Sequence, residues 1–308
     1  MSTHPMNRPR IDFTTDTAAP PGATARAGGP WGVTLMREGE ECEALDFLSR
    51  RPLDTVIMAG FIRDGGLESP CHRGSFYACR DAAGALAGVA LIGHVTLFEV
   101  RHGDALLALA RSARPTHDLH AVVGEREAVK LFRAHHAGLA GAGARVRREM
   151  FLVRRESVEA GGWVQGLCPA TLDQLPEIVS ASADMVEGAT GVNPLIGDPA
   201  GFRERTARRV ERGRVWAWFD EGRLVFKIDV AAETPEAIYV EGVYVNPAAR
   251  GRGHGVRCFA QLTNILLRRA DAVCLMVDED NAAALALYHR LGFVTHCAYD
   301  RVSLVAER

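Results

Sequence analysis

Residues 239–255, YVEGVYVNPAARGRGHG, decide the fold of the second half of this 308-residue chain. The β-prone run ends at Pro247, which cannot donate to a β-ladder. Gly251, Gly253 and Gly255 then allow tight turns before an amphipathic helix. Such a loop presents backbone N–H groups at a helix N-terminus, where the dipole favours an anion. A plain helix cap or a nucleotide loop stays open as an alternative, although the spacing matches neither GxGxxG nor Gly-Lys-Ser/Thr.

A second informative stretch covers residues 275–293, LMVDEDNAAALALYHRLGF. Asn281 stands at the predicted start of a helix, and Tyr288 follows seven residues later on the same helical face. Both side chains therefore point toward the end of the preceding strand. The simpler interpretation is an N-cap asparagine and a half-buried aromatic side chain.

Together the two stretches resemble the GNAT superfamily of acyl-CoA N-acyltransferases. The first matches the motif Arg-x-x-Gly-x-Gly through Arg250, Gly253 and Gly255. The second matches the motif Asn-x-x-Ala-x-x-Leu-Tyr-x-x-x-Gly-Phe through Asn281, Ala284, Leu287, Tyr288, Gly292 and Phe293. The resemblance implies a sheet that splays between strands 239–245 and 272–277, with acyl-CoA, acetyl-CoA in particular, in the opening.

The resemblance also implies roles for individual residues. The pyrophosphate would lie on the backbone of Arg250, Gly251, Arg252, Gly253, His254 and Gly255, and the pantetheine along Val243, Tyr244 and Val245. Asn281, with Ala284 in the same motif, would bind the pantetheine. The N–H of Val243 would polarise the thioester carbonyl. Tyr288 would protonate the leaving thiolate.

Glu241 is the candidate general base. An alkyl amine is protonated at pH 7 and has to lose a proton before it attacks a thioester. Glu241 lies two residues before Val243 on the same strand face. The alternative is that Glu241 only pairs with a substrate cation or with a nearby arginine.

The two halves of the chain share one order of predicted elements: strand, two helices, hairpin, strand, helix, strand, helix, strand. We therefore expect an α/β (α+β) fold of tandem GNAT-like domains. Each domain has a mixed, mostly antiparallel sheet flanked by helices and splayed between its fourth and fifth strands. We expect a disordered tail at 1–30, a degenerate domain at 31–158 and the catalytic domain at 159–308, opening with a strand at 163–167. The first half carries Arg101-His102-Gly103-Asp104 in place of the Gly-rich loop, so one cofactor per chain is expected.

A longer resemblance links the chain to bacterial two-domain GNAT proteins, whose N-terminal domain is uncharacterised. It rests on residues 51–56, 186–195 and 223–230. Some members of that group carry Gln at the position of Glu241. Glu187 and Lys227 either face the acceptor or are a surface glutamate and a strand-edge lysine.

The composition of the chain limits the classes of binding partner that we expect. The net charge is −2 and the pI about 6.6, which gives no reason to expect nucleic acid or a membrane surface as a partner. The basic run at 203–214 is interpreted as a solvated helix face. Seven cysteines without a CxxC pair, and no targeting segment, indicate reduced thiols in the cytoplasm. The histidines lack ligand partners at metal-binding spacing, so no metal is expected.

Three functions fit these features. The first is an N-acetyltransferase acting on a primary amine of a small molecule or a protein. The second is a non-catalytic acyl-CoA sensor or scaffold. The third is a tandem-GNAT biosynthetic enzyme acting on a large metabolite between its two halves. A monomer or a homodimer fits all three.

Overall fold

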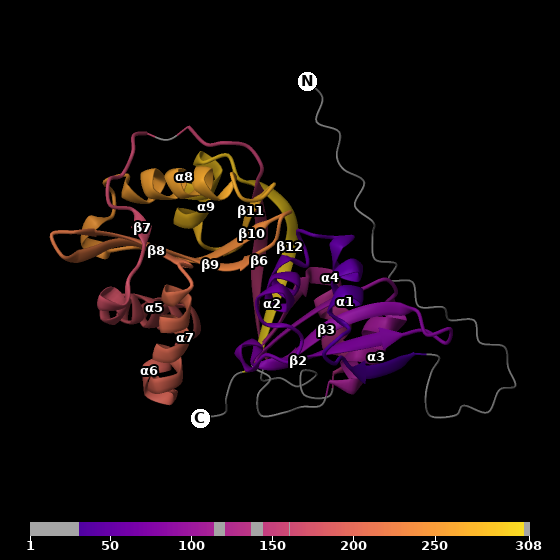
Figure 1. Cartoon of the computed structure of the whole chain (residues 1–308). Helices are drawn as coiled ribbons and strands as arrows, with labels where there is room; N and C mark the ends of the chain where they lie inside the picture. Colours follow the sequence, from indigo (N-terminus) through magenta and orange to yellow (C-terminus); the bar gives the residue numbers. More distant parts are fainter. Residues whose placement is uncertain (1–30, 114–120, 137–143, 160, 305–308) are drawn as a thin grey trace, which may run out of the picture. The chain divides into compact units, whose positions relative to one another are not determined.

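The computed structural model of the chain describes residues 31–113, 121–136, 144–159 and 161–304 (Figure 1). The tail expected to be disordered, residues 1–30, lies outside these ranges. Within the described ranges, no helix is both long enough and apolar enough to cross a membrane.

The chain divides into two compact units. The first unit comprises Met1–Met150 and Cys297–Arg308, and the second comprises Phe151–His296. The predicted domain boundary differs from this division: it lies after residue 158 and assigns the end of the chain to the second domain. The reason is β12 (Val294–Leu304), whose segment from Tyr299 to Ser303 pairs antiparallel with β5 (Ala121–Glu125) of the first unit.

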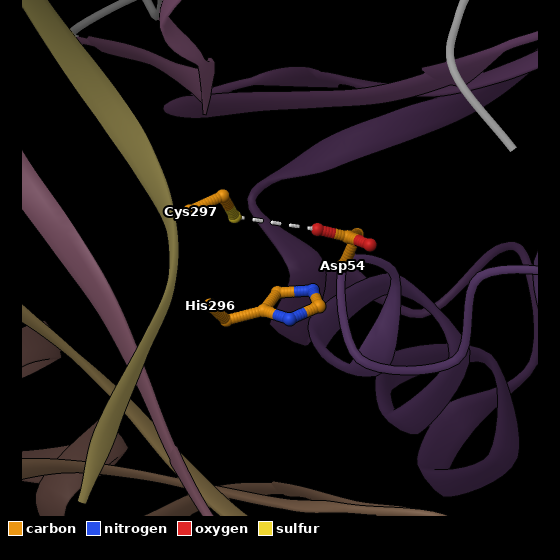
Figure 2. Close-up of side chains that lie close together, drawn as sticks. All are labelled: Asp54, His296 and Cys297. Carbon is orange, nitrogen blue, oxygen red and sulfur yellow. Dashed lines mark hydrogen bonds between the residues drawn. The ribbon is translucent and has the colours of Figure 1, made fainter. Parts of the chain in front are cut away.

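The first unit has a mixed sheet in the order β1-β2-β3-β4-β5-β12. Its other strands are β1 (Gly32–Leu35), β2 (Gly74–Arg80), β3 (Leu86–Gly93), β4 (Val95–Val100) and the first part of β6 (Ala144–Arg154). Its helices are α1 (Glu41–Ser49), α2 (Val56–Gly65), the 3-10 turn η1 (Pro70–His72), α3 (Gly103–Ser112) and α4 (Arg126–His135). Leu106 and Leu109 from α3 and Phe132 from α4 pack into its core. In β12, Cys297 Sγ donates to Asp54 Oδ1 in the turn before α2, at 3.6 Å (Figure 2).

The second unit repeats this plan with a sheet in the order β7-β8-β9-β10-β11. These strands are β7 (Cys168–Pro169), β8 (Val215–Asp220), β9 (Arg223–Glu233), β10 (Ile238–Val245) and β11 (Val273–Asp278). Its helices are η2 (Leu172–Gln174), α5 (Leu175–Thr190), α6 (Pro194–Gly197), α7 (Pro199–Glu211), η3 (Pro247–Ala249), α8 (His254–Leu266) and α9 (Ala282–Arg290). Helices α5 and α7 cover one face of this sheet, and α8 and α9 cover the other (Figure 1). The predicted mixed, mostly antiparallel sheet flanked by helices is confirmed.

Each unit contains a parallel strand pair that stays together for only two residues. In the second unit the partners are Ile238↔Val273 and Tyr239↔Cys274. In the first unit they are Val95↔Ala121 and Thr96↔Val122. Among the described residues beyond them, no ladder partner joins the two strands, so each sheet opens there.

One predicted strand, 163–167, is wrong. Its place is taken by an irregular segment with a turn at Gln165-Gly166, where Gly166 has φ +93°. The N–H and C=O of Val164 bond to the side chain of Gln261 in α8, at 2.7 and 3.3 Å, instead of to a neighbouring strand. A buried side-chain amide thus satisfies the backbone, and the short strand β7 begins only at Cys168.

Candidate functional site

The loop from Arg250 to Gly255 leads into α8 as expected for an anion-binding turn. Gly251 and Gly253 have φ of +76° and +77°, in the left-handed region that glycine adopts most easily. Gly253 is the N-cap of α8 and has no side chain, so the first N–H groups of this 13-residue helix receive no bond from the N-cap residue. These N–H groups and the positive end of the helix dipole together can hold a phosphate.

Gly255 brings three predicted segments together. A Cβ on Gly255 would lie 3.1 Å from Val245 Cγ2 at the end of β10 and 3.9 Å from Leu287 Cδ2 in α9. The absence of a side chain therefore lets the start of α8 approach the end of β10 closely, and Leu287 of α9 lies within van der Waals distance. The loop, the end of β10 and α9 meet in one place, as the sequence predicts.

Positive charge surrounds the loop. Arg250 Nε donates to the carbonyl of Val245 at 3.1 Å, and Arg257 Nη2 lies 2.9 Å from His254 Nδ1. Burial lowers the pKa of His254 below its ordinary value, and the positive charges of Arg257 and Arg252 lower it further. The imidazole is thus held neutral near pH 7, and the arginines supply the charge that attracts an anion.

Strand β10 becomes more exposed and irregular where the sheet opens. Its first three residues are buried, whereas Glu241 to Val245 are half-buried. Glu241 pairs with Asp229 and Tyr244 with Lys227, so β10 has one residue more than β9 between these pairs. This β-bulge contains Gly242, with φ +64°, and Val243. A bulge leaves one residue outside the ladder, and here that irregularity lies beside the opening of the sheet.

Asn281 and Tyr288 occupy the predicted positions on α9. Asn281 Oδ1 accepts from the N–H of Ala284 at 3.1 Å and caps the helix, which leaves its side-chain NH₂ able to donate elsewhere. Tyr288 is 6% exposed and packs against Phe259 and Phe293, with ring centroids 5.6 and 6.1 Å away. Burial raises the pKa of the Tyr288 hydroxyl to about 12, so the group keeps its proton at neutral pH.

Glu241 is paired with an arginine. Arg209 Nη1, from α7, lies 2.9 Å from Glu241 Oε1. The Glu241 side chain is 40% exposed, so the ion pair is open to solvent. The alternative of pairing with a nearby arginine therefore applies to Glu241 in this structure, and its role as a base stays a prediction.

Sequence reasoning missed the polar cluster beside this pair. Lys227 is 1% exposed, and its Nζ donates to Asp229 Oδ2 and to Ser182 Oγ in α5, each at 3.0 Å. Arg209 Nη1 reaches the same Asp229 oxygen at 3.4 Å. The available signal was Lys227 and Asp229 two residues apart, on one face of an otherwise apolar strand. Arg209 belongs to the basic run that was interpreted as a solvated helix face. The Glu187 carboxylate accepts from Asn193 Nδ2, at 3.0 Å.

The first unit is built differently at the equivalent place. Between Gly88↔Val100 and Leu91↔Leu97 its ladder runs without a register shift, so β4 has no bulge there. Counted from the parallel pairs, Glu99 corresponds to Gly242. Glu99 thus adds a side chain where the second unit has none.

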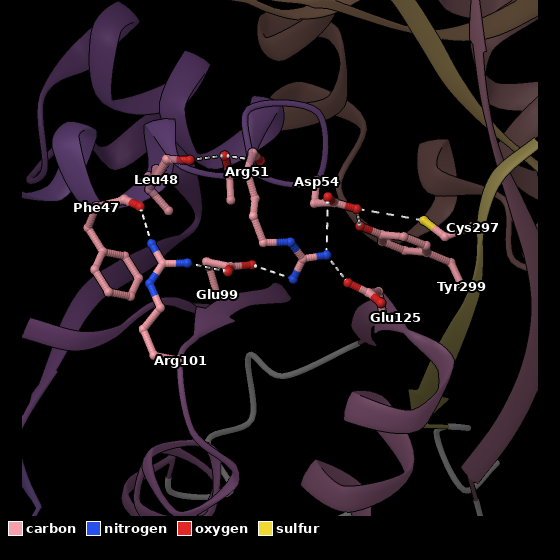
Figure 3. A network of polar contacts seen from close by, with 10 residues as sticks. Phe47, Leu48, Arg51, Asp54, Glu99, Arg101, Glu125, Cys297 and Tyr299 are labelled. Carbon is pink, nitrogen blue, oxygen red and sulfur yellow. Dashed lines mark hydrogen bonds and ion pairs between the residues drawn. The ribbon is translucent and has the colours of Figure 1, made fainter. Parts of the chain in front are cut away.

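The carboxylate of Glu99 joins a buried network that crosses the opening of the first sheet (Figure 3). Arg51 Nη1 lies 3.2 Å from Glu99 Oε2 on β4, and its Nη2 pairs with Glu125 at the end of β5. Asp54 Oδ2 is 3.1 Å from Arg51, and the Tyr299 hydroxyl lies 3.4 Å from Asp54 Oδ1. The Arg51 guanidinium therefore bridges the two diverging strands through Glu99 and Glu125.

Comparisons with known proteins agree with this geometry. Residues 189–293 match the family described as Acetyltransferase (GNAT) family. Over 115 residues the chain is 34% identical to mycothiol acetyltransferase of Salinispora tropica, which covers 32% of this chain and 38% of that protein. The mycothiol acetyltransferase of Salinispora arenicola is 37% identical over 103 residues, or 27% of this chain and 34% of that protein. The matches thus span well under half the length of these relatives.

Solved structures resemble nearly the whole chain. An acetyltransferase from the GNAT family of Colwellia psychrerythraea superposes with a TM-score of 0.56 at 11% identity, covering 89% of this chain and 100% of its own. A tandem GNAT protein from the clavulanic acid biosynthesis pathway superposes with a TM-score of 0.57 at 12% identity, covering 90% and 100%. At such identities the likeness shows the fold alone. The family match places a GNAT acetyltransferase domain in the second unit, and the solved structures show that the fold of such proteins extends over nearly the whole chain.

Proposed function

We propose that the second unit binds acetyl-CoA and transfers its acetyl group to a primary amine. One observation carries this proposal. Around Gly255, the uncapped start of α8, the open end of bulged β10 and helix α9 with Tyr288 all meet. Each of the three supplies one requirement of thioester chemistry. The start of α8 is a phosphate-binding site, β10 offers a backbone hydrogen-bond donor at its open edge, and Tyr288 is a general acid.

The donor would be held mainly by backbone atoms. The N–H groups between Arg250 and Gly255 bind the pyrophosphate, with Arg250 and Arg252 adding charge. Val243, Tyr244 and Val245 offer an open strand edge to the pantetheine amides. Asn281 can donate from its side-chain NH₂, since its Oδ1 is used by the helix cap.

The chemistry would proceed in one active site without a covalent enzyme intermediate. The amine nitrogen attacks the thioester carbon, and the Val243 N–H stabilises the developing oxyanion. The carbon–sulfur bond then breaks, and Tyr288 gives its proton to the leaving thiolate. A hydroxyl whose pKa is about 12 is fully protonated at neutral pH, as this step requires.

Glu241 would receive the proton that the amine loses. Its carboxylate lies two residues before Val243, and its partial exposure leaves room for an amine or a bridging water. In this proposal Arg209 orients the carboxylate through one oxygen and leaves the other to the acceptor. The acceptor is a primary amine of a small molecule or a protein.

We further propose that each chain binds a single acetyl-CoA. Over the described part of the first unit, β4 runs without a bulge, no Gly-rich loop follows it, and Arg51 with Glu99 and Glu125 spans the opening of the sheet. The names of the Salinispora relatives support acetyl transfer as the reaction class. The tandem architecture also fits an enzyme that acts on a large acceptor.

The test combines calorimetry with turnover. Titration with CoA should give one site per chain, and thiol release from acetyl-CoA should rise with at least one member of a panel of primary amines. Binding of CoA without amine-stimulated thiol release would favour the non-catalytic sensor instead. Two sites per chain would refute the assignment of the first unit.

A further inference from the structure

We propose that Lys227 is a positioning residue of the second unit: with Asp229 it holds the β10 bulge so that the Val243 N–H faces the thioester carbonyl. This inference rests on the proposed acetyl transfer. Neither residue touches the reacting atoms. They act through the backbone of Gly242 and Val243.

The strand register puts both charged side chains at the bulge. Asp229 is the β9 partner of Glu241, and Lys227 is the partner of Tyr244, so the two residues bracket Gly242 and Val243. Residues two apart on a strand point to the same face. That face is the one covered by α5 and α7, since Lys227 contacts Ser182 and Asp229 contacts Arg209.

The contacts below Gly242 are close. A Cβ on Gly242 would lie 2.9 Å from Asp229 Oδ2 and 3.2 Å from Lys227 Nζ. The two charged groups therefore lie directly against the Cα of the bulged residue. Together with a φ of +64°, this packing favours glycine at the bulge and leaves the bulge little room to move.

Burial of this pair is difficult to explain by stability alone. Lys227 is 1% exposed and Asp229 is 6% exposed. Replacing a buried ion pair by apolar residues of similar size is often neutral or stabilising, because desolvation offsets the attraction. The buried pair is better explained if it specifies one backbone conformation. The backbone segment that it contacts is the β10 bulge.

The pair also reaches Glu241. Asp229 Oδ2 accepts from Lys227 at 3.0 Å and from Arg209 at 3.4 Å, and the same Arg209 nitrogen lies 2.9 Å from Glu241. Asp229 Oδ1 is buried without a hydrogen-bond partner in the described chain. The orientation of the carboxylate therefore depends on these two cations.

The first unit offers an internal comparison. Phe98 of β4 corresponds to Glu241, and its partner on β3 is Ala90, which therefore corresponds to Asp229. Two residues earlier, Gly88 corresponds to Lys227. The unit with small uncharged residues at these positions is the unit without a bulge in its described β4 ladder, which supports a link between the charged pair and the bulge.

The first experiment compares wild type with Lys227→Met and with the double variant Lys227→Met/Asp229→Leu, which removes both charges and keeps an apolar, folded interior. We expect both variants to release thiol about 10- to 100-fold more slowly, since removal of an oxyanion donor costs about 100- to 1000-fold and displacement costs less. In Lys227→Met, which leaves Asp229 and its contact with Arg209 in place, the loss should be the same with each amine and with water. CoA affinity should stay within about twofold in both variants. Arg269→Met, which breaks the Glu233 pair at the other end of β9, is the matched control.

A second readout is independent of activity. Hydrogen exchange at the Gly242 and Val243 amides should quicken at least about tenfold in the double variant, relative to wild type and to Arg269→Met. Unchanged exchange and unchanged thiol release in a folded variant would overturn the inference. So would a loss confined to certain amines, because that pattern belongs to a residue that binds the acceptor. If wild type itself neither binds CoA nor releases thiol, the proposed function fails, and unchanged exchange would then reject the positioning role separately.

Discussion

Arg209 Nη1 lies 2.9 Å from Glu241 Oε1, and this pair joins helix α7 to the open part of strand β10. The charge of Glu241 is the main reason why the pKa of Arg209 is raised, with Asp229 adding to it. The arginine is thus fixed by two carboxylates on adjacent strands. This arrangement makes Glu241 a held side chain and not a freely rotating surface residue, which is a requirement for any role in proton transfer.

Replacing Glu241 by Gln should separate transfer to amines from hydrolysis. If the carboxylate takes the amine proton, Glu241→Gln lowers amine-dependent thiol release by about 100-fold or more, the usual contribution of a general base. Release to water and CoA affinity should stay close to wild type, because the donor site is untouched. Glu187→Gln in α5 is the matched control. An equal loss in both reactions would assign Glu241 to the architecture of the donor site instead.

Tyr288→Phe removes one hydroxyl and keeps the ring packed against Phe259 and Phe293. We expect kcat to fall about 10- to 1000-fold with CoA affinity unchanged, since only protonation of the thiolate is affected. With a pKa of about 12, Tyr288 keeps its proton up to that value, so its ionisation should not reduce the wild-type rate below about pH 11. Steady-state rates from about pH 6 to about pH 10.5 test this. A decline of the wild-type rate near about pH 9 that disappears in Tyr288→Phe would contradict it.

The sequence predicted those features that depend on local chemistry. Pro247 and the glycines fix the loop before α8, and Asn281 caps α9 as its residue type suggests. Contacts between distant segments were not predictable, because helix rotation and strand register decide them. Arg209 meets Glu241 only because α7 turns that side chain toward the sheet, and Arg51 meets Glu99 across 48 residues of chain. Residues 163–167 were predicted as a strand from their hydrophobic pattern. That pattern does not reveal that the Gln261 side chain takes up the backbone hydrogen bonds of Val164.

Gly253→Glu should abolish CoA binding. It adds a carboxylate at the anion-binding start of α8 and forces a side chain into a backbone with φ +77°. Gly84→Glu is the matched control, since Gly84 has φ +84° in the turn between β2 and β3 of the first unit. Calorimetric titration with CoA should show at least about 100-fold weaker binding for Gly253→Glu and unchanged binding for Gly84→Glu. Equal affinities in both variants would reject the loop as the pyrophosphate site.

Glu99 should make the stability of the first unit depend on pH. Burial raises its pKa to about 7, against the opposing charges of Arg51 and Arg101. A carboxyl group whose pKa is higher in the folded than in the unfolded state binds its proton more tightly when folded. The contribution of Glu99 to the free energy of unfolding is therefore fully present below its ordinary pKa of 4.5 and is lost as pH rises through about 7.

Glu99→Gln mimics the protonated side chain and should remove that dependence. Wild type should lose up to about 3 kcal/mol of unfolding free energy between about pH 5 and about pH 8 relative to Glu99→Gln, since one pKa unit is worth about 1.4 kcal/mol. Urea unfolding at the two pH values measures the difference, and Glu127→Gln, an exposed residue of α4, is the control. Parallel pH dependence of wild type and Glu99→Gln would mean that the Arg51 network keeps Glu99 ionised. In that case the network across the first sheet is ionised at neutral pH, and Arg51→Met, which removes the cation shared by Glu99, Asp54 and Glu125, should cost more stability than Glu99→Gln.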